Sequence, residues 1–345
     1  MVIAEPVSGR AQPDGRRLLL VHAHPDDETI GTGATMAHYA ASGAQVTLVT
    51  CTLGEEGEVL VPELGLLAAG HADQLGGWRI AELAAAMAEL GITDHRFLGG
   101  AGRFRDSGMM GDPANAKPRA FWRAAADPET FDAAVSALVE VICQVRPQVL
   151  VTYDDAGGYG HPDHIMAHRV ATAAVEAAAD PACAGAGGSW QVSKLYWTAT
   201  PRSVLAAGLA AVRAAGADLP FAAVESVREL PYGCDDQLVS TAIVAEDQAG
   251  AKLRALAAHR TQVSVHGSFY ALSNNLGQPV LGTEYFRLAL GSPAGDRDAQ
   301  DRETDLFAGI DFAGIDSGGI DIAGIDSAGI DSAGTDSAGI GEDTG

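Results

Sequence analysis

Residues 18–28 read Leu-Leu-Leu-Val-His-Ala-His-Pro-Asp-Asp-Glu, an aliphatic run that turns directly into a polar cluster. The four aliphatic residues predict a fully buried strand. Pro25 and the acidic residues after it predict the end of that strand, because proline and clustered charges interrupt buried strands. The polar cluster is therefore expected at the carboxyl end of a strand inside a sheet.

The sequence after this cluster alternates between helical and strand patterns. Residues 31–42 predict a helix that ends at Gly43, and residues 46–51 predict a second buried strand, which completes a βαβ unit. Such alternation predicts an α/β fold with a doubly wound, Rossmann-like, mostly parallel sheet. The pattern continues with helices expected at 80–90 and 131–145 and strands expected near 96–98 and 149–153.

The second half of the chain is less regular. It predicts strands near 194–197, 239–244 and 285–290 and a helix at 246–258, which we expect to form a smaller C-terminal cap region.

The C-terminal end of the sequence is a short repeat. From Leu306 onward the chain repeats Phe-Ala-Gly-Ile-Asp and close variants of it, with one isoleucine per five residues. That period places apolar side chains on neither a helical face nor a strand face, so residues 296–345 are predicted to be a disordered acidic tail. The alternative is a β-solenoid, whose stacked turns need more apolar positions than this repeat offers.

Composition and charge exclude several classes of function. The 345 residues contain 22 Lys and Arg against 45 Asp and Glu, and the net charge of −23 opposes binding to nucleic acid or to an anionic membrane surface. Residues 296–345 hold 13 of the acidic and 2 of the basic residues, so the body is only moderately acidic. No apolar run is long enough for a signal peptide or a membrane span. The 4 cysteines are scattered without a Cys-x-x-Cys pair, which fits the predicted cytoplasmic location. No pattern indicates the oligomeric state.

A second polar cluster follows another predicted strand. Residues 159–164, Tyr-Gly-His-Pro-Asp-His, come after the strand near 149–153, so both clusters leave the carboxyl ends of strands, where open α/β folds bind ligands. Neighbouring carboxylates repel each other unless a cation lies among them. His24, Asp27 and His164 would supply two nitrogens and one oxygen, which leaves a fourth position open for water, as in catalytic zinc sites.

The carboxylates of these clusters allow two interpretations. As a spare carboxylate beside a metal, Asp26 is predicted to take a proton from the bound water. The alternative is that Asp26, Asp27 and Asp163 only occupy helix N-termini, where anions are favoured. One His-x-x-Asp pattern is weak evidence, but two His/Asp clusters on Pro-containing turns after buried strands favour the metal site. Iron(II) would accept the same ligands as zinc, so the identity of the metal stays open.

The two clusters also resemble the sequence motifs of a known enzyme family. His24-Pro-Asp-Asp-Glu28 together with His161-Pro-Asp-His164 resembles the zinc-dependent N-deacetylases of the LmbE-like/PIG-L family, which remove acetyl groups from N-acetylglucosaminyl conjugates. The similarity extends to three further segments, residues 78–83, 105–109 and 259–262. The division of the chain that it implies is a flexible N-terminus, a zinc deacetylase domain and a low-complexity acidic repeat tail, at residues 1–15, 16–291 and 292–345.

The resemblance implies a substrate and a role for each polar residue. Within the family, the chain is similar to the actinobacterial enzymes of mycothiol biosynthesis that act on N-acetylglucosaminyl-inositol, which implies a small aminosugar-inositol substrate. His24, Asp27 and His164 become the ligands of one zinc ion per subunit, and Asp26 becomes the general base. The resemblance also implies that Tyr159 polarises the amide carbonyl and that His161 supports the tetrahedral intermediate and the leaving amine. Asp163 would orient an imidazole. Arg79 and Asp106 would contact the sugar and inositol. Arg79 could alternatively be a solvated side chain on an amphipathic helix.

Three other functions remain open from the sequence. A related amidase cleaves mycothiol S-conjugates at the same kind of amide, but that branch tends to carry a lysine where this chain has Thr29-Ile30-Gly31-Thr32. A metal-dependent phosphoesterase would also use His and Asp clusters, although it needs ligands for two metals, and an acidic chain does not favour a phosphate. A non-catalytic sugar-binding module would not need Asp26 or the complete set of ligands.

Overall fold

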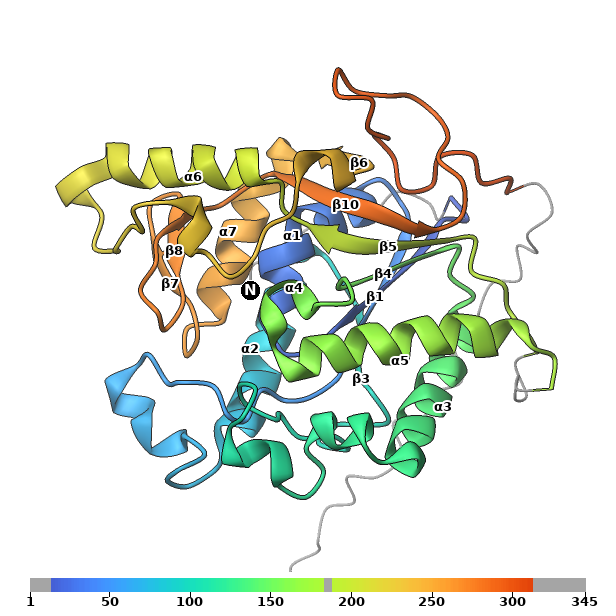
Figure 1. The fold of residues 1–345 in the computed structure, drawn as a ribbon, viewed down its shortest axis with the longest axis horizontal. Coiled ribbons are helices and arrows are strands. Elements are labelled where there is room, and N and C mark those ends of the chain that lie inside the picture. The colour runs from blue at the N-terminus through green and yellow to red at the C-terminus, as the bar shows by residue number, and fades with distance from the viewer. Residues whose placement is uncertain (1–13, 183–187, 313–345) are drawn as a thin grey trace, which may run out of the picture.

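A seven-stranded sheet forms the centre of the computed structural model, which describes residues 14–182 and 188–312 (Figure 1). Its strands are β1 (Arg17–His22), β2 (Gln45–Thr50), β3 (Asp94–Phe97), β4 (Val149–Thr152), β5 (Lys194–Ala199), β6 (Thr241–Val244) and β10 (Thr283–Leu290). They are ordered β3-β2-β1-β4-β5-β10-β6 across the sheet. The first five in this order are parallel, and β10 is antiparallel to both of its neighbours. The predicted mostly parallel α/β fold is confirmed.

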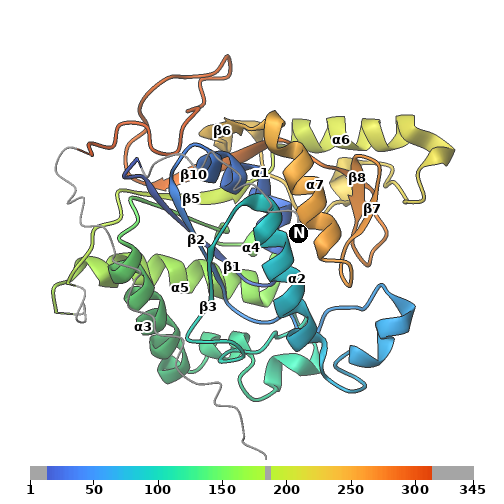
Figure 2. The same ribbon diagram turned by 180° about the vertical axis from the view of Figure 1, so that it is seen from behind.

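Helices cover both faces of this sheet, as Figures 1 and 2 show. On one face lie α3 (Pro128–Val145) and α5 (Pro162–Ala179), and on the other lie α1 (Asp27–Ala41), α2 (Leu75–Leu90) and α7 (Ala249–Ala258). Within β1, Leu19 and Val21 join the core under α3 and α5, whereas Leu18 and Leu20 join the core on the opposite face. The strand is thus buried on both faces, as its aliphatic run predicts.

A smaller cap layer lies next to α7 (Figure 1). It contains α6 (Arg202–Ala215) and an antiparallel sheet of β7 (Ser264–His266), β8 (Phe269–Ala271) and β9 (Gln278–Pro279). Its composition differs from the expectation. The strands near 194–197, 239–244 and 285–290 and the helix at 246–258 are β5, β6, β10 and α7, which belong to the central sheet and its helical cover because β10 pairs with both β5 and β6. The sequence analysis did not predict α6, although Val204, Leu205, Leu209 and Val212 recur along it at helical spacing. None of the described helices is both long enough and apolar enough to cross a membrane.

Short helical turns lie in some of the connections. They are η1 (Pro62–Leu67), η2 (Pro113–Ala116), η3 (Phe121–Ala125), α4 (Gly157–Gly160), η4 (Gly216–Asp218), η5 (Val227–Glu229), η6 (Asp236–Leu238) and η7 (Glu246–Gln248).

The segment 292–312 is part of the folded body, which corrects the expected start of the tail at residue 292. Glu303 is fully buried, and its carboxylate accepts a hydrogen bond from Lys194 Nζ at 2.7 Å. Leu306 and Phe307 lie in the core on the α1 face of the sheet. The sequence prediction is wrong here because this segment is as acidic as the repeat that follows it, so composition does not separate the two. Residues 1–13 and 313–345 lie outside the described residues. The predictions of a flexible N-terminus and of a disordered tail, with a solenoid as the alternative, fall on these residues.

Candidate active site

Both polar clusters lie at the same edge of the sheet. Residues 23–28 follow β1, and residues 157–164 follow β4, the parallel neighbour of β1. The chain winds from β1 to β3 in one direction and from β4 to β5 in the other. The crevice between β1 and β4 is therefore the switch point at which open α/β sheets bind ligands.

The structure brings His24, Asp27 and His164 together. Asp27 Oδ2 lies 3.2 Å from His24 Nδ1 and 3.3 Å from His164 Nε2. The ligands of a tetrahedral zinc ion, each about 2.1 Å from the metal, are roughly 3.4 Å apart, so these atoms have a suitable spacing. His164 Nε2 is buried and has no hydrogen-bond partner among the described residues. Because buried polar atoms are normally partnered, this nitrogen and the carboxylate beside it fit a divalent metal.

The other side of the His24 ring faces two more carboxylates. His24 Nε2 lies 3.3 Å from Asp163 Oδ2 and 3.6 Å from Asp106 Oδ1. The backbone N–H of Ser107 donates to the same Asp163 oxygen at 2.9 Å, which fixes that carboxylate. Burial alone would lower the pKa of His24, but Asp106, Asp163 and Asp27 raise it well above its usual value. The His24 ring thus directs Nε2 at Asp163 and presents Nδ1 to Asp27.

Asp26 precedes α1 in a strained backbone conformation, with a φ of 109°. Its side chain makes no capping hydrogen bond to the helix, so the interpretation of Asp26 as a simple helix cap is wrong. A non-glycine residue in such a conformation costs about 1–3 kcal/mol and needs support from its surroundings. Arg79 provides that support, because its guanidinium donates to Asp26 Oδ2 at 3.1 Å and also to the carbonyl oxygen of Pro25. Burial raises the pKa of Asp26 to about 6, and the charge of Arg79 opposes the rise.

Arg79 and Asp106 both line the cavity that Asp26 faces. Arg79 is only 3% exposed, so the interpretation of Arg79 as a solvated side chain is wrong. Asp106 accepts hydrogen bonds from the backbone N–H groups of Gly108 at 2.8 Å and Glu56 at 3.1 Å. Their contact with the sugar and inositol stays a prediction.

A buried ion pair behind Asp26 was not predicted. Glu28 accepts hydrogen bonds from the backbone N–H of Asp26 and from His259 Nε2, both at 2.9 Å, and the Glu28 and His259 side chains are fully buried. Burial alone would raise the pKa of Glu28 and lower that of His259, but their attraction reverses both shifts. The pair lies 231 residues apart in the chain, so no local spacing could have indicated it. Through the hydrogen bond from its N–H to Glu28, the backbone of Asp26 is held by this pair.

His161 caps α5 and faces the proposed metal ligands. Its Nδ1 accepts the backbone N–H of Asp163 at 3.1 Å, which leaves Nε2 as the protonated nitrogen of the neutral ring. One of its nitrogens lies within 4.8 Å of nitrogens of His24 and His164. Burial and the neighbouring imidazoles lower the pKa of His161, so the ring is neutral. Asp163 does lie in the first turn of α5, as the helix N-terminus interpretation expects, but its carboxylate also meets His24 Nε2 at 3.3 Å.

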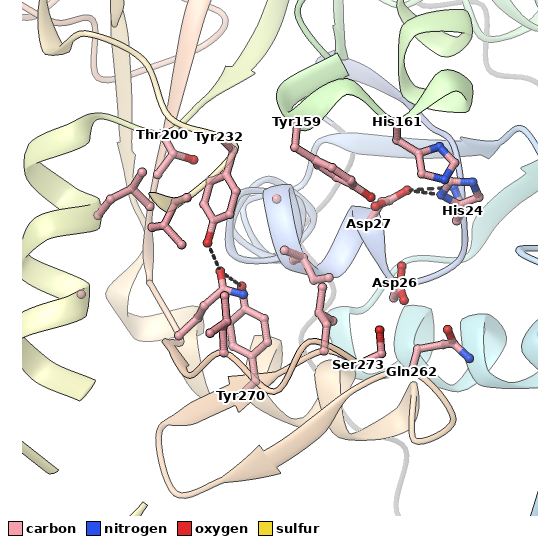
Figure 3. Close-up of a pocket in the computed structure, with 18 of the residues that line it drawn as sticks. His24, Asp26, Asp27, Tyr159, His161, Thr200, Tyr232, Gln262, Tyr270 and Ser273 are labelled. Carbon is pink, nitrogen blue, oxygen red and sulfur yellow. Dashed lines mark hydrogen bonds and ion pairs between the residues drawn. The ribbon is translucent and has the colours of Figure 1, made fainter. Parts of the chain in front are cut away.

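Tyr159 reaches the same ligands from the turn α4. Its ring meets that of His164 edge to face, with the centroids 5.0 Å apart, and the side chain is 40% exposed to the cavity (Figure 3). The turn approaches α5 closely at Gly157, which has a φ of +65° and where a Cβ would lie 2.8 Å from the Cβ of His164. A side chain at Gly157 would therefore clash with His164 and with the backbone of α5.

Tyr153 is a further residue that the sequence analysis did not identify. Its ring stacks on that of His164 with the centroids 4.2 Å apart, and its hydroxyl accepts the backbone N–H of Ala23 at 2.9 Å. The same hydroxyl lies 3.2 Å from Nδ1 of the buried His22. Tyr153 thus joins the ends of β1 and β4 and holds the plane of the His164 ring. Its place directly after β4 is a signal that could have identified it.

A cavity of about 530 Å³ opens over these residues (Figure 3). This volume lies within the range of about 300–1,000 Å³ that is typical of small-molecule sites. At one end it is lined by His24, Asp26, Asp27 and His161, and at the other by side chains of α6 and of the small sheet.

Comparison with known proteins assigns the chain to a family. Residues 19–175 match the family described as PIG-L: GlcNAc-PI de-N-acetylase. A relative from Geodermatophilus obscurus, named 1D-myo-inositol 2-acetamido-2-deoxy-alpha-D-glucopyranoside deacetylase, is 62% identical over 296 residues, which cover 86% of this chain and 98% of the relative. The chain belongs to the PIG-L family. A second relative of this PIG-L enzyme, from Acidothermus cellulolyticus and with the same name, is 59% identical over 298 residues, 86% of this chain and 96% of the relative.

A solved structure shares the fold of the chain, and the extent of the match to the Geodermatophilus relative agrees with the packing of residues 292–312. This is the structure of GalB, the 4-carboxy-2-hydroxymuconate hydratase of Pseudomonas putida KT2440. It covers 82% of this chain and 100% of its own chain, with a TM-score of 0.52. At 14% sequence identity, the similarity is one of fold alone. The 86% of 345 residues matched by the Geodermatophilus relative amounts to about 297 residues, more than the 291 that precede the expected tail. The family similarity therefore continues past Gly291.

Proposed function

We propose that this enzyme hydrolyses the acetamide of N-acetylglucosaminyl-inositol (1D-myo-inositol 2-acetamido-2-deoxy-alpha-D-glucopyranoside) to glucosaminyl-inositol and acetate, as a step of mycothiol biosynthesis. The observation that carries the proposal is the 62% identity, over 98% of its length, to a relative named for this reaction. The cavity supports it, because a pocket of about 530 Å³ meets the proposed metal ligands at one end and leaves room for a glycoside at the other.

The residues fit one divalent metal ion per subunit, held by His24, Asp27 and His164. Zinc is the metal we propose, and iron(II) would be accepted by the same donors. When bound, the metal acts as a Lewis acid that polarises the amide carbonyl and makes water more acidic. Asp163 orients the His24 ring, because its carboxylate lies 3.3 Å from Nε2 on the side away from Asp27.

Asp26 is the proposed general base. Arg79 occupies its Oδ2, which leaves Oδ1 to accept the proton of the water that attacks the carbonyl carbon. The strained backbone, held by Arg79 and Glu28, keeps this carboxylate beside Asp27 without making it a ligand. The base is thus positioned before the substrate arrives.

Tyr159 and His161 are the proposed donors to the carbonyl oxygen as negative charge develops on it. Burial raises the pKa of Tyr159, so its phenol stays protonated, and His161 offers its Nε2 proton because Nδ1 is already an acceptor. The loss of one such donor typically lowers kcat by about 10²–10³. His161 also supports the leaving amine, while Arg79 and Asp106 contact the sugar and inositol.

The proposal is tested by incubating the purified enzyme with N-acetylglucosaminyl-inositol and with a mycothiol S-conjugate in parallel and measuring the released amine. We expect turnover of the acetylated substrate to exceed that of the conjugate. Comparable turnover of both would contradict the choice of deacetylase over amidase, and no turnover of the first would refute the proposed reaction.

We place this reaction in the cytoplasm. The free thiols of the buried Cys51 and Cys143 support this location, because unpaired cysteines suit a reducing compartment. The partner is the small substrate, since the acidic charge of the chain opposes contact with nucleic acid.

A further inference from the structure

The end of the cavity away from His24 carries three polar side chains that the proposed mechanism does not use. Tyr232, Tyr270 and Gln278 all line the cavity, and we name them the Tyr-Gln-Tyr cluster. The hydroxyl of Tyr232 donates to Gln278 Oε1 at 3.0 Å, and that of Tyr270 donates to the same oxygen at 3.2 Å. Figure 3 shows both tyrosines across the cavity from Asp27.

The fold holds the Tyr-Gln-Tyr cluster from three directions. Tyr270 of β8 and Gln278 of β9 are direct antiparallel partners, so their side chains project from the same face of the small sheet. Tyr232 comes from the segment between α6 and β6. Helix α6 packs closely on β9, because a Cβ at Gly208 would lie 3.2 Å from the ring of Pro279. The cluster is therefore formed before a ligand binds, which lowers the entropic cost of recognition.

The hydrogen-bond pattern determines what this cluster offers to a ligand. Burial raises the pKa of Tyr270 and of Tyr232, so both phenols keep the protons that they donate to Oε1. Within the described part of the chain, Gln278 Nε2 donates to no protein acceptor. The cluster therefore presents two N–H donors and the remaining lone pairs of two phenol oxygens. Adjacent hydroxyl groups of a polyol, which both donate and accept, complement this set.

Apolar side chains form part of the cavity wall around the cluster. An amide in such a wall is favourable only when water or a ligand satisfies its hydrogen bonds. The acetamide end of the substrate belongs at the metal ligands and its sugar near Arg79 and Asp106, so the group attached to the sugar extends toward this far end. The apolar lining residues here are Val204, Leu205, Leu209, Leu230, Leu272 and Leu276.

We propose that the Tyr-Gln-Tyr cluster binds hydroxyl groups of the inositol ring and that Gln278 is a specificity-determining residue, an inference that rests on the proposed function. Gln278 Nε2 donates to the ring hydroxyls, and the phenol oxygens of Tyr232 and Tyr270 accept from them. The C–H face of the ring lies on the leucine side chains. Selection of inositol over smaller groups thus takes place far from the reacting amide.

The test compares two substrates that share the acetamide and the sugar, namely N-acetylglucosaminyl-inositol and methyl N-acetyl-α-glucosaminide. Gln278→Glu keeps an oxygen that accepts from both tyrosines but removes the N–H donors, and Gln278→Leu removes both. For each variant we expect kcat/KM with the inositol substrate to fall about tenfold, mainly through KM, which is the effect of one or two hydrogen bonds between neutral groups. Turnover of the methyl glycoside should stay within about twofold of wild type.

Two further variants complete the design. Gln300→Glu makes the same chemical change at an exposed site and should leave both substrates unaffected. Tyr232→Phe removes one hydroxyl from the half-buried member of the cluster and is expected to lower kcat/KM for the inositol substrate selectively, even if substitutions of Gln278 impair folding.

The outcomes separate this inference from the proposed function. Equal losses on both substrates would show that the cluster only supports the fold, and no loss on either would show that it does not contact the substrate; each result overturns the inference. Wild-type enzyme that hydrolyses the methyl glycoside but not the inositol substrate would refute the proposed function, and the inference with it, before any variant is compared.

Discussion

Truncation after Gly291 is predicted to unfold the protein, whereas truncation after Phe312 is predicted to leave it intact. The first cut removes Glu303, Leu306 and Phe307 from the folded body, and the second removes the repeat, whose five-residue period predicts neither a helical nor a strand face. The comparison therefore isolates the contribution of the segment 292–312.

The magnitude follows from what this segment buries. The side chains of Lys194 and Glu303 are 4% and 0% exposed, and removal of one partner from a buried ion pair costs about 3–5 kcal/mol. Leu306 and Phe307 are 0% and 3% exposed, and each contributes about 1.5–3 kcal/mol through burial. The expected loss of about 6–11 kcal/mol is comparable with the whole stability of a typical domain, about 5–15 kcal/mol.

Urea unfolding followed by circular dichroism measures this difference. The chain ending at Phe312 should unfold with the same midpoint as the full chain, and the chain ending at Gly291 should show no cooperative transition. Glu303→Gln in the full chain isolates the ion pair and should lower the free energy of unfolding by about 3–5 kcal/mol. If the chain ending at Gly291 were within about 1 kcal/mol of the full chain, the segment would not be part of the core and the argument would be refuted.

Two further predictions concern the residues around the site. His164→Ala should abolish metal binding and turnover together, as measured by elemental analysis and amine release; full metal occupancy in this variant would show that His164 is not a ligand. The Glu28–His259 pair should make stability depend on pH: the raised pKa of His259 gives a contribution that is complete below the usual 6.5 and is lost as the pH rises through the raised value. The lowered pKa of Glu28 gives a contribution that is present above the usual 4.5 and is lost as the pH falls through the lowered value. The stability advantage of wild type over Glu28→Gln in urea unfolding should therefore be greatest between about pH 4.5 and 6.5, and a difference that did not vary with pH would contradict the pairing.

Much of the fold and the position of the site follow from local patterns. The aliphatic run Leu18–Val21 predicts a strand buried on both faces, and β1 has that burial. Two polar clusters at strand ends predict a shared site, because the carboxyl ends of adjacent parallel strands lie at one edge of a sheet. Since β1 and β4 are neighbours, His24 and His164 meet although they are far apart in the chain.

The supporting interactions could not be predicted in the same way. The contact between Glu28 and His259 depends on how α7 packs on α1, and no spacing in the sequence encodes that packing. Burial of Arg79 depends on the strained turn at Asp26, which only the folded backbone reveals. Helix α6 is an exception, because Val204, Leu205, Leu209 and Val212 recur at helical spacing and could have indicated this part of the cap.

The measurement that tests the central claim most directly is the turnover and metal content of Asp26→Asn with N-acetylglucosaminyl-inositol. The substitution keeps the shape of the side chain and removes the base, so kcat should fall by about 10²–10⁴ while bound metal and KM remain close to those of wild type. The acidic limb of the pH–rate profile should disappear with the carboxylate. Loss of the metal would make Asp26 a ligand, and a near-normal kcat would mean that another group takes the proton; either result would contradict the account.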